Sequence, residues 1–286
     1  DDRYATALAV SRSTYRSAST AVIATGVDFP DALSAGPLAA QRGGPVLLTY
    51  GNYLDSELLQ ELNRLGVKTI FVAGGTGAVP AGVENELIKQ GFSVKRLGGK
   101  NRFQTSLKIA EEVRAGSGKS AIPVVVTTGT VFPDALSATP AAAQMGAAIV
   151  LSNENTLVSE VTDYLRSSSV TYAVAVGGPA RAAANGAGIS LKWSAVGKDR
   201  FGTSARVMER VFPNATHAHV ATGMDFPDGL AAGPAAFVTN GPVLLSQKDV
   251  LPPAVAGELR QTKQVTLVGG TGVLSQQIAF AIRNAN

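Results

Sequence analysis

Three arginines recur along the chain at nearly equal spacing, and they are the side chains best suited to bind an anion. Arg3, Arg102 and Arg200 lie 99 and 98 residues apart, and each is followed by an aromatic residue and, three positions on, by threonine. A guanidinium stays charged at any relevant pH and can bind phosphate or carboxylate through two parallel hydrogen bonds. The arginines are therefore candidate anion ligands. An equally good interpretation is an Arg–Asp ion pair inside each unit, which orients the helix that begins there.

A second repeated segment places one carboxylate in each unit. The pattern Thr-Gly-x-x-Phe-Pro-Asp ends at Asp31, Asp134 and Asp228. An aspartate in the first turn of a helix complements the helix dipole by ~0.3–1 kcal/mol, so a structural role is the simpler interpretation. The alternative is that these carboxylates pair with the arginines or contact a ligand. Because each unit shares a single carboxylate and glycoside hydrolysis uses two, the sequence predicts no catalytic residue.

The sequence offers little for a metal ion or a cofactor. It has no cysteine, and its two histidines, His217 and His219, would share one face of a strand without a third ligand. The glycine pairs at 74–75, 177–178 and 269–270 look superficially like phosphate-binding loops, but neither GxxxxGK[ST] nor GxGxxG is present. We therefore expect no metal and no cofactor, and a tight turn at each glycine pair.

The arginine, aspartate and glycine motifs keep the same order three times, which indicates three tandem modules. We place these modules at residues 1–93, 94–190 and 191–286. In the first module the pattern predicts helices over 4–13, 30–42, 55–65 and 80–90 and strands over 20–25, 46–48 and 69–73. The strands are short and apolar without alternation, so we expect an α/β fold in which parallel sheets are buried between helices.

Two further short strands, expected over 94–97 and 191–196, precede the second and third modules. The sequence does not say whether each pairs with the module before it or after it, and in either case one module lacks such a strand. The linkers are minimal, so we expect the modules to form one closed triangular body. Ligands of parallel α/β sheets bind beyond the carboxyl ends of the strands, where the Phe-Pro-Asp and Gly-Gly motifs both lie.

The overall composition excludes several classes of protein. With 45% apolar residues, 16% charged residues and a mean hydropathy of +0.15, the chain is not disordered. Its net charge of +4 is spread without basic runs, which argues against nucleic-acid binding. No apolar run reaches the ~18–20 residues of a membrane span. The chain starts with Asp-Asp-Arg, so we expect any export signal to have been removed or to lie outside these residues.

The repeated motifs resemble those of the cell-wall-binding repeat type 2 family of Gram-positive bacteria. The resemblance covers all three modules and rests in the first on residues 2–7, 24–33, 45–48 and 72–75. It implies three Toprim-like modules in a pseudo-threefold triangle that act as a secreted, S-layer-associated anchor without catalytic activity. The implied partner is an anionic secondary polymer of the cell wall, teichoic-acid-like or another anionic glycan. A separate effector domain outside this chain is also implied.

The middle module departs from the family pattern. The family associates an aliphatic Pro-Ile-Leu-Leu motif with polymer attachment, and this maps to residues 45–48 and 242–245, whereas the middle copy reads Ala-Ile-Val-Leu at 148–151. Three apolar residues in a buried strand suit a core better than a direct contact. Two other classes of function remain as alternatives. One is an enzyme acting on glycans or nucleotides, and the other is a protein-binding lattice or adhesion module.

Overall fold

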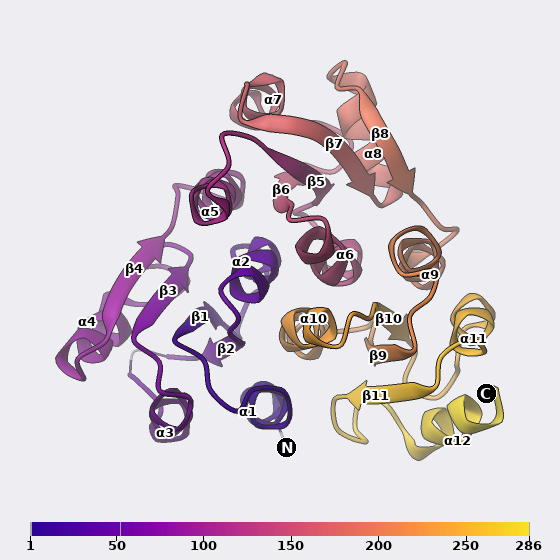
Figure 1. The fold of residues 1–286 in the computed structure, drawn as a ribbon, viewed down its shortest axis with the longest axis horizontal. Helices are drawn as coiled ribbons and strands as arrows, with labels where there is room; N and C mark the ends of the chain where they lie inside the picture. Colours follow the sequence, from indigo (N-terminus) through magenta and orange to yellow (C-terminus); the bar gives the residue numbers. More distant parts are fainter. Residues whose placement is uncertain (1, 52, 286) are drawn as a thin grey trace.

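Three parallel β-sheets, each flanked by helices, form the computed structural model, which describes residues 2–51 and 53–285 (Figure 1). This confirms the predicted α/β fold. The first module contains α1 (Arg3–Thr14), β1 (Thr20–Thr25), a short 3-10 helix (Ala32–Ser34), α2 (Ala35–Gln41), β2 (Val46–Thr49), α3 (Ser56–Leu65), β3 (Thr69–Ala73), α4 (Ala81–Lys89) and β4 (Ser93–Leu97).

The second module repeats this alternation of helices and strands, and the third repeats it without a final strand among the described residues. The second contains α5 (Arg102–Ser117), β5 (Ile122–Thr128), α6 (Pro133–Gln144), β6 (Ala148–Ser152), α7 (Ser159–Arg166), β7 (Val170–Val176), α8 (Gly178–Gly186) and β8 (Leu191–Ala195). The third contains α9 (Arg200–Val211), β9 (His217–Thr222), α10 (Pro227–Val238), β10 (Val243–Ser246), α11 (Pro253–Leu259), β11 (Gln264–Val268) and α12 (Gln276–Ala285).

The strand order decides where the two extra strands belong. The sheets run β2-β1-β3-β4, β6-β5-β7-β8 and β10-β9-β11. β4 pairs in parallel with β3, with Thr69 opposite Ser93, and β8 pairs with β7, with Ala173 opposite Leu191. Each extra strand therefore joins the preceding module, and among the described residues the third sheet has three strands.

Local sequence explains the limits of the helices. Asp55 caps α3, because its Oδ1 accepts hydrogen bonds from the backbone N–H groups of Glu57 and Leu58 at 2.8 and 3.3 Å. Gly66 ends the same helix in the left-handed region at φ 74°, which a residue with a side chain adopts only with strain. The strands behind these helices are buried on both faces, as β1 and β2 show along their whole length.

The modules meet at three central helices, α2, α6 and α10, which pack against one another in the middle of the triangle (Figure 1). Thr139 of α6 lies between Gly36 of α2 and Gly233 of α10, where an added Cβ would stand 2.2 and 2.4 Å from its Cγ2 atom. The backbones of the three helices therefore approach closely only because these positions lack side chains.

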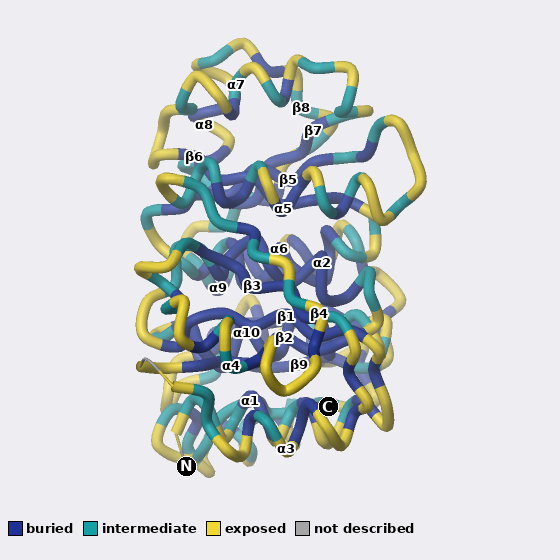
Figure 2. Tube along the Cα trace, turned by 90° about the vertical axis from the view of Figure 1, so that its left-hand side faces the viewer, coloured by how far each residue is buried: buried dark blue, intermediate teal, exposed yellow. Residues whose placement is uncertain are grey.

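The pattern of burial agrees with this arrangement around three central helices. In side view the central segments are buried and the outer helices and turns are exposed (Figure 2). One hydrophobic core runs through all three modules and includes Leu38, Leu136 and Leu230 from the central helices. In the described part of the chain, no helix has both the length and the apolar character needed to cross a membrane.

Candidate functional site at the module junctions

The repeated arginines begin the first helix of each module. Asp2, Asn101 and Asp199 cap α1, α5 and α9, and their side-chain oxygens accept backbone N–H groups of the first turn. The next residue in each case is the repeated arginine, so its side chain leaves the very start of the helix. Each Nη1 donates to the carbonyl oxygen of the glycine after the module's first strand. Arg3 reaches Gly26 and Arg200 reaches Gly223 at 2.6 Å, and Arg102 reaches Gly129.

The same arginines also contact a neighbouring module. The guanidinium of Arg102 lies over the ring of Phe29, that of Arg200 over Phe132, and that of Arg3 over Phe226, at 6.0, 5.9 and 5.4 Å from the ring centroids. Arg102 and Arg200 therefore each cover a phenylalanine of the preceding module, and Arg3 of the first module covers Phe226 of the third. The three contacts form a closed cycle.

The three phenylalanines contact one another where the modules converge. The ring centroids of Phe29 and Phe132 are 5.7 Å apart, those of Phe29 and Phe226 5.7 Å, and those of Phe132 and Phe226 6.2 Å, with tilted or edge-on geometry. Sequence reasoning missed these residues as a site. The signal was present, because each phenylalanine stands in the repeated Phe-Pro-Asp segment.

The aspartates lie beside the arginine of the next module. Burial raises the pKa of Asp134 to about 6, and the opposing effects of the Arg200 charge and a hydrogen bond with Thr203 are smaller. Burial likewise raises the pKa of Asp228 to about 6, against a hydrogen bond with Thr6 and the charge of Arg3. The Asp134 and Asp228 carboxyl groups therefore lie near an arginine of another module, and their contact with a ligand stays a prediction.

The glycine pairs belong to the same arrangement. Gly74, Gly177 and Gly269 have φ values of 119°, 97° and 127°, and an added Cβ would stand 2.9, 2.0 and 2.6 Å from an oxygen of the repeated aspartate. A side chain at these positions would be strained and would collide with the carboxylate. The tight turn predicted for the glycine pairs thus makes room for Asp31, Asp134 and Asp228.

Ion pairing by the arginines differs between the junctions. Arg3 Nη2 lies 3.3 Å from Asp225 Oδ2, so this ion pair joins the first module to the third. The positions equivalent to Asp225 are Asp28 in the first module and Val131 in the second. Among the described residues, an Arg–Asp pair inside one module is not found for Arg3, Arg102 or Arg200. The repeated arginines therefore contact a glycine carbonyl of their own module and a phenylalanine of the neighbouring module.

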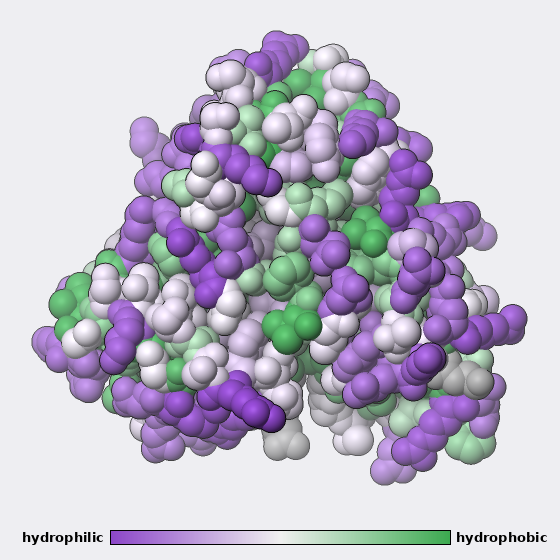
Figure 3. All heavy atoms as spheres, viewed as in Figure 1, coloured by the Kyte–Doolittle hydropathy of each residue, from purple (hydrophilic) through white to green (hydrophobic). Residues whose placement is uncertain are grey.

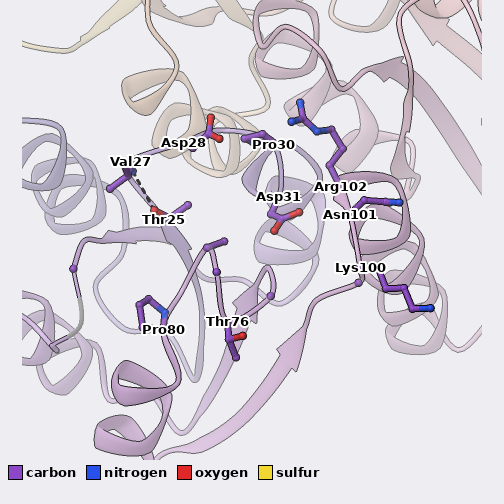
Figure 4. A pocket seen from close by; sticks show the side chains of 15 residues that line it. Thr25, Val27, Asp28, Pro30, Asp31, Thr76, Pro80, Lys100, Asn101 and Arg102 are labelled. Carbon is purple, nitrogen blue, oxygen red and sulfur yellow. Dashed lines mark hydrogen bonds between the residues drawn. The ribbon is translucent and has the colours of Figure 1, made fainter.

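An open cleft adjoins two of the junctions. The cleft between the first and second modules has a volume of about 740 Å³ and is shown in Figure 4, where Asp31 and Arg102 extend from facing elements. Lys100 and Asn101 come from the turn before α5. The equivalent cleft between the second and third modules measures about 280 Å³. These clefts lie at the carboxyl ends of the strands, where the sequence placed ligand binding.

Charges of both signs line the two clefts. The first is lined by Lys100, Arg102, Asp28 and Asp31, and the second by Lys198, Arg200, Asp134 and Asp199. On the face shown in Figure 3, hydrophilic side chains surround a smaller apolar area near the centre. The clefts therefore offer hydrogen-bond donors and acceptors side by side.

The remaining sequence candidates have structural roles. The aliphatic motifs at 45–48 and 242–245 form β2 and β10, whose residues are buried throughout. The rings of His217 and His219 stack at a centroid distance of 4.7 Å, and His217 Nε2 hydrogen-bonds Thr266 at 2.8 Å. Burial lowers the pKa of His219 to about 4, so this imidazole is neutral over the physiological range. In the described part of the chain, no group of three ligating side chains is placed to hold a metal ion.

The fold is that of a tandem-repeat α/β protein, in which one arginine–phenylalanine contact recurs at each of the three junctions. The chain belongs to the cell wall binding domain 2 (CWB2) family, whose model matches residues 1–84, 96–185 and 195–279. It is therefore a cell-wall-binding module of a cell wall or surface protein, which confirms the family resemblance seen in the sequence.

Curated relatives are longer than this chain. N-acetylmuramoyl-L-alanine amidase LytC of Bacillus subtilis is 28% identical over 289 residues, which cover 99% of this chain and 57% of the relative. The amidase enhancer of the same organism is 28% identical over 283 residues, or 96% of this chain and 38% of the relative. The chain thus spans between about two fifths and three fifths of their length.

Two solved structures share the fold. Cwp6 from Clostridium difficile superposes with a TM-score of 0.87 at 23% identity, over 98% of this chain and 46% of that one. Cwp8 from the same organism gives a TM-score of 0.87 at 26% identity, over 100% of this chain and 50% of that one.

Proposed function

We propose that this chain is the non-catalytic anchor of a secreted surface protein and binds an anionic secondary polymer of the cell wall without a covalent bond. The single observation that carries this proposal is that one junction recurs three times, with an arginine of one module lying over a phenylalanine of its neighbour. An enzyme needs one asymmetric catalytic set, whereas an anchor gains from several equal sites. Three weak contacts on one rigid body can raise the overall affinity by ~10²–10⁴-fold.

The arginines retain binding capacity after their structural contacts. A guanidinium has five N–H groups. Nη1 of each repeated arginine uses one for a glycine carbonyl, and Nη2 of Arg3 uses another for Asp225. We assign the remaining donors of Arg3, Arg102 and Arg200 to phosphate or carboxylate groups of the polymer. The carboxylates of Asp31, Asp134 and Asp228 would accept hydrogen bonds from its hydroxyls. Each of the three modules would contribute one arginine and one aspartate, and at each junction the arginine of one module would act beside the aspartate of its neighbour.

Exposed lysines beside the arginines allow the proposal to be tested without loosening the junctions. Lys100 and Lys198 line the two clefts and are exposed. The double variant Lys100→Ala, Lys198→Ala should bind purified walls several-fold more weakly than the parent. The matched control replaces two exposed lysines that do not line these clefts, Lys119→Ala and Lys263→Ala, and should bind normally.

Co-sedimentation with walls before and after removal of the secondary polymer identifies the ligand. Binding should be lost with the polymer. Binding that survives the treatment would refute the proposed ligand and point to peptidoglycan or to wall proteins. Turnover of wall glycan or of nucleotides by the purified chain would refute the non-catalytic role. The effector domain implied by the resemblance would lie outside these residues, as the greater length of the relatives allows.

A further inference from the structure

The third sheet leaves one strand position open. β3 and β7 are each covered along one edge by a parallel strand, β4 and β8. At the same edge of β11 the described residues provide no partner, and the backbone N–H and C=O groups there lack a neighbouring strand. β11 is accordingly less buried than β3, since four of its five residues are exposed or partly exposed. Unpaired strand edges are sites at which extended polypeptide adds to a sheet.

Hollows lie against this edge on both sides. One, of about 450 Å³, lies between β11 and α1 and is lined by Ala9, Val10 and Leu267 among others. The second, of about 230 Å³, lies on the side of α12 and is lined by Val265 and Ile282. A strand placed beside β11 would fill the space between these hollows, with alternate side chains entering one and the other.

The two complete junctions show what fills such a position. The turn after β4 is tied to the next helix, because Gly99 N donates to Thr105 Oγ1 at 3.0 Å. The turn after β8 makes the same contact, from Gly197 N to Thr203 Oγ1 at 3.2 Å. The strands themselves also contact that helix. Lys95 of β4 pairs with Glu112 of α5 at 2.5 Å, and Arg210 of α9 lies over the ring of Trp193 in β8.

Helix α1 carries the equivalent surface without the equivalent strand. Thr6 stands where α5 and α9 carry the threonines that accept from the turn, and Ser13 stands where they carry Glu112 and Arg210. Ser13 is exposed, and its hydroxyl donates only to the Val10 carbonyl of its own helix. Thr6 and Gly270 line the same hollow, so the start of α1 lies at the end of β11 to which a parallel strand would lead.

We propose that the open edge of β11 binds one extended polypeptide strand, parallel to β11, supplied by the stretch of polypeptide attached directly ahead of α1. The strand completes a four-stranded third sheet and closes the junction between the third and first modules. β4 and β8 run into α5 and α9 in this way, and α1 carries the same threonine, Thr6, at the equivalent position. The residue at the end of the strand is small or aliphatic, because Leu97 and Ala195 are buried at that position.

The test supplies the strand from this chain's own sequence. Residues 191–199, which form β8 and its turn, are fused ahead of Arg3 in place of residues 1–2. Hydrogen exchange of the β11 amides should slow by at least about tenfold, and the melting temperature should rise. A matched fusion with proline at Trp193 and at Ala195 should leave both unchanged, because proline cannot donate to the ladder and fixes the backbone.

The outcomes separate the possible occupants. Equal exchange in the two fusions would overturn the proposal, since the added residues would then not pair with β11. Protection only when residues 191–199 are attached after residue 286 would overturn the assignment to the polypeptide ahead of α1. Concentration-dependent protection of the parent chain, with a dimer in sedimentation, would show that a second copy covers the edge and would overturn it as well.

Discussion

Replacing Asp134 by asparagine is expected to raise the free energy of unfolding at neutral pH and to leave it unchanged in acid. Burial raises the pKa of Asp134 from 3.8 to about 6 in the folded protein. A carboxyl group with a higher pKa when folded opposes folding above that pKa and ceases to do so below the unfolded value. The difference between these two pKa values corresponds to at most about 3 kcal/mol of unfolding free energy. Because solvent in the cleft screens the charge, we expect the variant to gain about 1–2 kcal/mol.

The assay is urea unfolding of parent and variant at steps from about pH 4 to about pH 8. The difference in free energy of unfolding between variant and parent should be near zero at about pH 4 and should grow as the pH rises through about 6. Asp163→Asn, at an exposed position of α7, is the matched control and should show no such trend. A variant less stable than the parent at every pH would refute the reasoning, because the ionised contact with Arg200 would then be favourable overall.

Three further predictions concern the centre of the molecule and its ligand. Phe29→Ala should lower the free energy of unfolding by about 2–3 kcal/mol, since it removes two ring contacts and the ring under Arg102. The control Phe280→Ala, at a 67% exposed position, should change the free energy of unfolding little. Gly233→Ala should destabilise through its collision with Thr139, and adding Thr139→Ala should restore part of the loss of melting temperature; equal melting of single and double variants would contradict this. Wall binding should weaken between 0.1 M and 1 M salt as the Debye length falls from ~10 to ~3 Å, and sedimentation that is independent of salt would indicate apolar or hydrogen-bonded attachment.

The sequence predicted the repeating architecture well because its signals are local. Short apolar strands, the capping residue Asp55 and the stop at Gly66 each act within a few residues, and they recur three times in the same order. The repetition itself gave the three modules. The carboxylate and guanidinium candidates also came from a local pattern of charged side chains at the carboxyl ends of strands, and their role in binding stays a prediction.

The partners of those candidates were not predictable from the same signals. Arg3 pairs with Asp225, 222 residues away, and no periodicity reports a contact between separate modules. The cluster of three phenylalanines was missed for the same reason, because Phe29 and Phe226 look like ordinary core residues until three modules converge. Nor could the sequence assign β4 to the preceding sheet, since a five-residue strand between two modules can pair with either. Its register with β3 is a property of packing.

The cyclic cover of each phenylalanine by the next module's arginine fixes how many repeats the molecule can have. Contacts that join one surface to a different surface of the next copy close into a ring at a single copy number. A solenoid can lengthen by duplication of one repeat, because each copy touches only its neighbours. Here, deleting or duplicating one module would leave a bare aromatic ring and an unmatched guanidinium at the break. Such arrays should therefore change in evolution by whole sets of three.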